Sequence, residues 1–177
     1  MPYKGLIMAI LISPMIVPLI ITAAGMFFFY ARINLVYTFT GVILAHVALA
    51  TPFVVITVTA TLVGFDMNMV KAAQSLGAKP MRTFFKVIMP LILPGIISGA
   101  LFAFITSFDE VVIVMFMASI DQLTIPKQMW AGIRQEISPV ILCMATCLVL
   151  LSIFLLTTVE LLRSCLLYTS PSPRDPE

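Results

Sequence analysis

Charged residues are scarce in this chain. They make up 10% of its 177 residues, whereas an ordinary soluble domain carries about 25%. Ten Lys and Arg residues against eight Asp and Glu residues give a net charge of +2, and the basic residues form no stripe that could follow a nucleic acid. The composition therefore excludes an ordinary soluble domain and gives no support to a nucleic-acid partner.

Metal ligands and nucleotide-binding motifs are also rare. The single histidine, His46, has no Cys, Asp or Glu at ligand spacing, so we expect it to hydrogen-bond between helices rather than to bind a metal. Cys143 and Cys147 lie one helical turn apart, where small packing residues are expected rather than a disulfide. No Gly-x-x-x-x-Gly-Lys-Ser/Thr phosphate loop occurs. The sequence thus predicts no catalytic residue, no metal and no cofactor held by this chain.

Long apolar runs dominate what remains. The chain is 61% hydrophobic, with a mean hydropathy of +1.13. A helix needs roughly 20 apolar residues to cross the ~30 Å hydrocarbon layer, and four runs are long enough: residues 6–30, 36–64, 91–118 and 139–162. They lack the strict alternation of barrel strands. We therefore predict an all-α polytopic membrane protein whose membrane domain covers residues 1–164.

A polar island separates the second and third apolar runs, at about residues 65–90. Asp66 is a good N-cap for a short helix through Leu76, and Gly77 permits a sharp turn. Pro80 suits the first turn of a second short helix over residues 81–87. That helix presents apolar anchors and cationic edges before Pro90: Arg82, Phe84, Phe85, Lys86 and Val87. The island therefore predicts a helix-turn-helix that projects from the bilayer.

The basic residues orient the predicted bundle. If the island is cytoplasmic, the inner side holds six of them and the outer side three. The inner six are Lys4, Lys71, Lys79, Arg82, Lys86 and Arg163, and the outer three are Arg32, Lys127 and Arg134. This distribution agrees with the positive-inside rule and predicts that both termini are cytoplasmic.

The island resembles the EAA loop of ABC importer permeases, the cytoplasmic segment that contacts the ATPase. Ala72, Ala73, Gly77 and Pro90 match the motif identically. Val87 and Met89 replace its usual Ile and Leu conservatively, whereas Lys71 stands where the family usually has Glu. The resemblance implies that residues 65–90 couple this chain to a separate ATPase subunit, which holds ATP and Mg²⁺.

The wider pattern resembles the spermidine/putrescine branch of these permeases, from about Tyr3 to Arg163. It includes Ser13-Pro14, residues 51–55, residues 107–112 and residues 123–130. Such permeases have six spans, so the chain resembles the last four. The resemblance implies a polyamine importer of the bacterial inner membrane, with a second permease subunit and a periplasmic solute-binding protein as further partners.

Two carboxylates are expected deep in the third run. We place Asp109 and Glu110 about two-thirds of the way across it, counting ~1.5 Å per residue. Ionisable groups at such depth usually face a bundle interior or a water-filled path. A cationic polyamine would be stabilised there, so both residues are predicted in the substrate pathway, with Asp109 first. The alternatives are that they cap a helix end or bind Lys127 or Arg134.

The sequence leaves two other functional classes open. A secondary transporter or channel driven by an ion gradient would need intramembrane ionisable groups, and Asp109, Glu110 and His46 are the candidates. A membrane scaffold without transport activity would use the island as an ordinary interaction loop. Binding of a purified ATPase to residues 65–90 separates the importer from both.

Residues 165–177 change abruptly to a Pro- and Ser-rich composition. The tail can be encoded by a sequence that resembles a widely used transposase sequencing adaptor. We therefore expect it to be a non-native, disordered tail that follows a natural sequence ending near Ser164. Sequencing of the source DNA across this end checks the expectation, and unrelated codons would contradict it.

Overall fold

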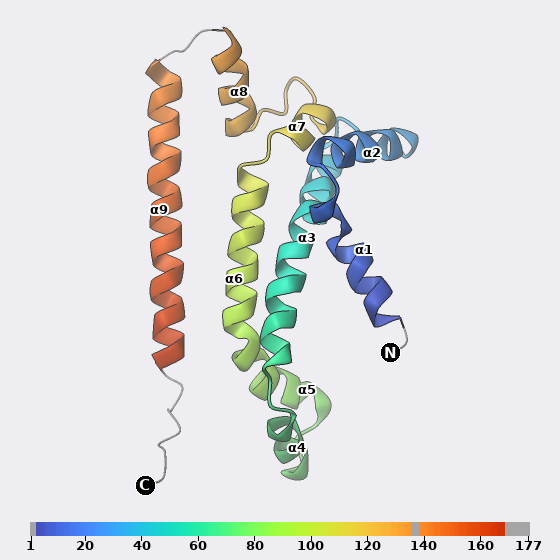
Figure 1. Ribbon diagram of the computed structural model, residues 1–177, viewed down its shortest axis with the longest axis vertical. Helices are drawn as coiled ribbons and strands as arrows, with labels where there is room; N and C mark the ends of the chain where they lie inside the picture. The colour runs from blue at the N-terminus through green and yellow to red at the C-terminus, as the bar shows by residue number, and fades with distance from the viewer. Residues whose placement is uncertain (1–2, 136–138, 169–177) are drawn as a thin grey trace.

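The computed structural model describes residues 3–135 and 139–168, and every element in these ranges is a helix (Figure 1). The elements are α1 (Lys4–Ile16), α2 (Leu19–Arg32), α3 (Phe39–Val63), α4 (Met67–Ser75), α5 (Pro80–Thr83), the π-helix η1 (Phe84–Ile88), α6 (Met89–Phe108), α7 (Val112–Met117), α8 (Ile125–Gln135) and α9 (Pro139–Tyr168). Three helical segments are long and apolar enough to cross a membrane: Phe39–Val63, Pro80–Phe108 and Pro139–Thr158. These features confirm an all-α polytopic membrane protein.

The first predicted span is not one straight helix. The structure divides it into α1 and α2, which are bent by 110° at a break between Ile16 and Leu19. The residue before a proline is driven out of the helical region by the proline ring, and Val17 is accordingly extended with ψ 136°. Pro18 also lacks the N–H that would continue the helix. The pair forms a fourth span only if both halves lie within the membrane.

The third predicted span, residues 91–118, ends earlier than expected. Helix α6 stops at Phe108, and the short helix α7 begins at Val112. The last bond of α6 runs from the Asp109 N–H to the Ile105 carbonyl, and the Glu110 side chain then caps the new helix. The two carboxylates therefore mark a break in the helix, and they do not lie along a continuous one.

Helix α9 includes the fourth predicted span and continues to Tyr168, past the expected boundary at Ser164. Residues 169–177 of the predicted tail lie outside the described residues. Cys143 and Cys147 are free thiols that are exposed on α9, so the expectation that they pack inside the bundle is wrong. In this chain α9 has no buried side chain within its candidate span.

The closest helix pairing joins α3 to α6 (Figure 1). Gly95 and Gly99 of α6 are buried against α3, where a Cβ on Gly95 would collide with the Thr61 hydroxyl and one on Gly99 with that of Thr57. Both threonine hydroxyls donate to carbonyls of their own helix, Thr57 to Phe53 at 2.9 Å and Thr61 to Thr57 at 3.0 Å. Small residues spaced four apart allow membrane helices to approach closely. Here the small-residue face of α6 packs against a neighbour within the same chain.

A buried cluster at the other end of α3 joins three helices. Ala23 of α2, Ala45 of α3, and Ile113 and Met117 of α7 are fully buried in it. The Tyr37 N–H also donates to the Met117 carbonyl at 2.9 Å. These contacts hold α2 and α7 against α3 at the end of the molecule opposite α4 (Figure 1).

Replacing Gly99 by Ala should destabilise the bundle, because the new methyl group would overpack the contact with Val54 and Thr57. We expect a loss of about 1–3 kcal/mol. The matched control is Gly25→Ala in α2, where a Cβ meets no atom within 4 Å and a gain of up to about 1 kcal/mol is expected. Unfolding midpoints of the detergent-purified protein measure both changes, and equal midpoints for the two variants would contradict the packing.

Candidate functional site

The first candidate site is the segment predicted to contact an ATPase, residues 65–90, which is called the coupling loop below and lies at the α4 end of the molecule (Figure 1). Its first helix, α4, begins where the Asp66 carboxylate accepts a hydrogen bond from the Asn68 N–H at 2.9 Å. This is the predicted N-cap, which satisfies one of the N–H groups left open at a helix start. The helix ends at Ser75, one residue before the predicted end, and Leu76 is its C-cap.

The turn after α4 depends on Gly77. Its φ of +80° is a left-handed conformation that residues with a Cβ rarely adopt. The Ala78 N–H donates to the Ala73 carbonyl at 3.0 Å, and the Gly77 N–H donates to that of Gln74 at 2.9 Å. This pair of bonds is a Schellman motif, which closes a helix C-terminus. The turn predicted at Gly77 is thus confirmed.

The second helix of the loop differs from the prediction. Pro80 occupies its first turn as expected, but α5 leads through η1 into α6, so that residues 80–108 form one helical span. At the end of η1 the Met89 N–H donates to Phe84 rather than to Phe85. A proline at position 90 has no N–H and would clash with the Lys86 carbonyl in a regular α-helix. The wider π-helical turn precedes this proline, and Pro90 does not interrupt the span.

The coupling loop exposes apolar and cationic side chains together. Leu76, Met81 and Phe85 are 89%, 68% and 55% exposed, and Phe84 is 38% exposed. The other exposed residues of the predicted motif are Lys71, Ala72, Gly77, Arg82, Lys86 and Pro90, while Ala73, Val87 and Met89 are partly buried. Thr83 is buried, and its hydroxyl donates to the Lys79 carbonyl at 3.2 Å within the loop. The result is a firmly held protrusion with an uncovered apolar surface.

The second candidate site lies at the far end of α6, where the two carboxylates separate. Glu110 is buried, with 6% of its surface exposed, and its Oε1 accepts the Ile113 N–H at 2.7 Å. Asp109 is exposed. Glu110 therefore accepts a hydrogen bond from the first turn of α7, which agrees with the alternative in which the carboxylates cap a helix end.

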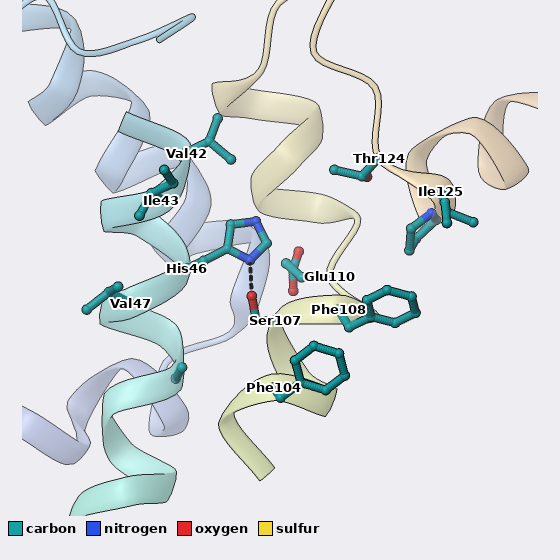
Figure 2. Close-up of a pocket in the computed structure, with 12 residues that line it drawn as sticks. Val42, Ile43, His46, Val47, Phe104, Ser107, Phe108, Glu110, Thr124 and Ile125 are labelled. Carbon is teal, nitrogen blue, oxygen red and sulfur yellow. Dashed lines mark hydrogen bonds between the residues drawn. The ribbon is translucent and has the colours of Figure 1, made fainter. Parts of the chain in front are cut away.

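Glu110 also lines a cavity of about 470 Å³ between α3, α6 and the start of α8. In Figure 2 its carboxylate faces this cavity together with His46 and Ser107. His46 Nδ1 and Ser107 Oγ lie 2.8 Å apart and link α3 to α6. The expected role of His46 as a hydrogen-bonding residue between helices is thus confirmed, with Ser107 as its partner.

Asp109 lines a neighbouring cavity of about 350 Å³ between α6 and α9. Phe104 and Phe108 line both cavities, and their rings stack with centroids 5.5 Å apart. Among the described residues, neither cavity has a Lys or Arg side chain in its lining. Each cavity therefore combines an aromatic wall with one carboxylate.

The two basic side chains considered as partners for these carboxylates are engaged elsewhere. The Lys127 ammonium donates to the Ser119 carbonyl at 3.1 Å, and the Arg134 guanidinium lies 5.9 Å from the centre of the Trp130 ring. These contacts do not support the alternative in which Lys127 or Arg134 binds Asp109 or Glu110.

Sequence reasoning missed the aromatic wall and the separation of the carboxylates. A signal for the break was present, because two adjacent acidic residues are costly within a continuous lipid-facing helix. The stacking of Phe104 on Phe108 follows from their spacing of four residues, which places them on one helix face. A chain rich in phenylalanine gives no reason to single out this pair.

Comparison with known proteins identifies the family. Residues 2–164 match the family described as "Binding-protein-dependent transport system inner membrane component". The matched segment includes the coupling loop and both carboxylates.

Individual relatives are consistent with this match. Over 90% of its length the chain is 30% identical to spermidine/putrescine transport system permease protein PotC of Haemophilus influenzae and 28% identical to that of Escherichia coli. Over 75% of its length it is 33% identical to a probable sulfate transport system permease protein, cysT, of Chlorokybus atmophyticus, of which 47% is covered. The chain spans about 60% of the length of the two PotC proteins.

The family match covers nearly the whole described chain, and the fold agrees with it in both the apolar spans and the exposed loop between them. The chain belongs to the family of inner membrane components of binding-protein-dependent transport systems.

Proposed function

We propose that this chain is a permease subunit of an ATP-driven importer and that it couples to a separate ATPase through residues 65–90. The exposed, rigidly capped coupling loop is the observation that carries the proposal. Leu76, Met81 and Phe85 present apolar surface of the kind that anchors protein interfaces. Lys71 replaces the usual Glu of the motif and is exposed on α4, so contacts from this position would carry the opposite charge.

A permease subunit of this kind has a defined orientation in the membrane, and the other subunits have separate roles. The coupling loop and both termini lie in the cytoplasm, and the spans lie in the bacterial inner membrane. ATP and Mg²⁺ are bound and hydrolysed on the ATPase subunit, and this chain performs no catalysis. A second permease subunit completes the pathway, and a periplasmic solute-binding protein delivers the solute. ATP binding favours one of two bundle conformations because the ATPase binds that conformation better.

The charge of the cavities favours a cationic solute. Among the relatives, PotC is a spermidine/putrescine permease protein, whereas cysT is a probable sulfate permease protein. A sulfate path would be stabilised by basic groups, but within residues 3–135 and 139–168 the charged residues that line the two cavities are Glu110 and Asp109. Carboxylates stabilise ammonium groups, and aromatic faces attract cations within about 6 Å. We therefore propose polyamines as the solute and Asp109 and Glu110 as pathway residues.

An ion-gradient-driven carrier remains the competing proposal, but the structure gives it less support. A proton relay would use His46 and Glu110. Yet Glu110 is engaged in capping α7 and His46 in pairing with Ser107. Such a carrier would also leave the exposed apolar surface of the coupling loop without a partner. Uptake that proceeds without ATP would favour the carrier.

Replacing Phe85 by Ala should weaken ATPase docking, because it removes an exposed aromatic anchor from the coupling loop. We expect binding weaker by on the order of ten-fold or more, measured as the amount of ATPase that co-purifies with the permease complex. The control is Phe29→Ala in α2, where Phe29 is 60% exposed at the opposite end. Equal loss in both variants, or no loss in either, would contradict the docking role.

Replacing Asp109 by Asn in the assembled transporter should reduce polyamine uptake on the order of ten-fold, since a charged hydrogen bond contributes about 1.5–3 kcal/mol. ATPase binding should be unchanged, because Asp109 lies at the far end of α6. Uptake of labelled putrescine into proteoliposomes measures the effect. Glu160→Gln, an exposed carboxylate on α9, is the control for the loss of one charge. Uptake by the Asp109 variant that equals the control would exclude Asp109 from the pathway.

A further inference from the structure

The single histidine of the chain borders the cavity that Glu110 lines. His46 Nδ1 lies 2.8 Å from Ser107 Oγ, and in Figure 2 the Glu110 carboxylate lies beside the same ring. The second ring nitrogen, Nε2, has no hydrogen-bond partner among the described residues. It is also not sealed off, because no unpaired side-chain nitrogen or oxygen within those residues is fully buried. One ring nitrogen of His46 is therefore open to a proton.

Few groups contribute charge to this cavity. Glu110 is its acidic residue and is 6% exposed, whereas Asp109 lines the neighbouring cavity. The nearby Lys127 ammonium is bonded to the Ser119 carbonyl, and helices α1, α2 and α9 contribute no residue to the described lining. Within that described lining, His46 is thus the one side chain that can place a positive charge beside Glu110.

The partner of His46 can hold the ring in both of its charge states. A serine hydroxyl both donates and accepts hydrogen bonds. The Ser107 hydroxyl can donate to a neutral Nδ1, and after rotation about its C–O bond its oxygen can accept from a protonated Nδ1. The ring therefore stays paired with Ser107 when it is protonated, and the contact between α3 and α6 is kept. A change in pH thus changes the charge of the cavity and leaves its walls in place.

A positive charge beside Glu110 would compete with a cationic solute. A neutral His46 leaves the negative charge of Glu110 available to an ammonium group, whereas a protonated ring repels that group. We propose that His46 controls the affinity of this cavity for cations and lowers polyamine uptake when the outer side becomes acidic. The inference rests on the proposed function, in which polyamines pass Glu110, and it adds a residue that makes their passage depend on pH.

The relevant pH is that of the outer side. The cavity lies at the end of α6 opposite the coupling loop (Figure 1), so a cytoplasmic loop places it toward the outside. Histidine usually changes its charge between about pH 5 and pH 8. Aliphatic ammonium groups lose their proton only near about pH 10, so putrescine keeps its charge over this range. The proton on His46 is not transported, and uptake still requires ATP.

The test uses the assembled transporter in proteoliposomes, with the putrescine-loaded solute-binding protein outside and ATP inside. Putrescine transported per ATP hydrolysed, called the transport yield below, is measured at an outer pH of about 7.5 and of about 5.5. The inner pH is held constant. A general loss of folding or docking lowers uptake and hydrolysis together, whereas poor loading of the cavity lowers the yield. The wild-type yield should fall on the order of ten-fold at the lower pH.

His46→Asn removes the titration and keeps the hydrogen bond. An asparagine amide can bond to the Ser107 hydroxyl from nearly the position of Nδ1, but it takes up no proton in this range. The transport yield of this variant should be the same at both pH values. The variant shares Glu110 and the solute-binding protein with the wild type, so a pH effect that arises in either of them would persist.

His46→Lys places a permanent positive charge in the cavity. Its transport yield should be lower than that of His46→Asn at both pH values, on the order of ten-fold. The control is Leu44→Lys, which adds the same charge to α3. Leu44 is 43% exposed and does not belong to the described lining of the cavity. The control should show the pH dependence of the wild type.

Three outcomes overturn the inference. The first is a wild-type transport yield that is equal at both pH values, and the second is a His46→Asn variant whose yield falls as much as that of the wild type. The third is a His46→Lys yield equal to that of Leu44→Lys. A wild-type transporter that hydrolyses ATP but imports no putrescine at either pH contradicts the proposed solute instead.

Discussion

The close approach of α3 and α6 is the contact on which the rest of the structure depends. Gly95 and Gly99 let the two backbones meet where any Cβ would collide with threonine side chains. Because lipid is as apolar as the helix surface, packing of this kind replaces the hydrophobic effect as the force that holds membrane helices together. The coupling loop connects α3 to α6, and Ser107 of α6 bonds to His46 of α3 near the far end. Both candidate sites are therefore built on this one helix pair.

The coupling loop could be predicted closely because its signals are local. An N-cap depends on one side chain and the N–H groups two or three residues later, and Asp66 behaves accordingly. A left-handed turn depends on the residue that occupies it, and Gly77 has the required φ. The two adjacent alanines and the proline occupy fixed positions of a motif that recurs across a family. They therefore show which residues of this chain match the motif. None of these features needs information about distant parts of the chain.

The breaks in the first and third apolar runs were harder to predict, because apolar composition is the same on either side of them. Pro18 indicates a kink, but the 110° bend also depends on where α2 finds a buried partner. That partner is α7, through Ala23, Ile113 and Met117, and the Glu110 carboxylate satisfies the Ile113 N–H in the first turn of α7. A hydropathy average over residues 91–118 treats them as one span. The long-range contact between α2 and α7 is not visible in that average, although it separates α7 from α6. The long apolar runs could thus be found from the sequence, but the breaks within the first and third runs could not.

The two connections of the coupling loop differ in stiffness. The connection to α3 is not helical, whereas the connection to α6 is. On one side α3 ends at Val63, and non-helical residues separate it from α4. On the other side α5, η1 and α6 form one helical segment from Pro80 to Phe108. A helix resists bending, while a non-helical joint allows its two sides to rotate. The helical segment from Pro80 thus connects the coupling loop directly to the break at Asp109 and Glu110. The π-helical turn before Pro90 keeps that segment unbroken, since a regular α-helix would place the proline ring against the Lys86 carbonyl.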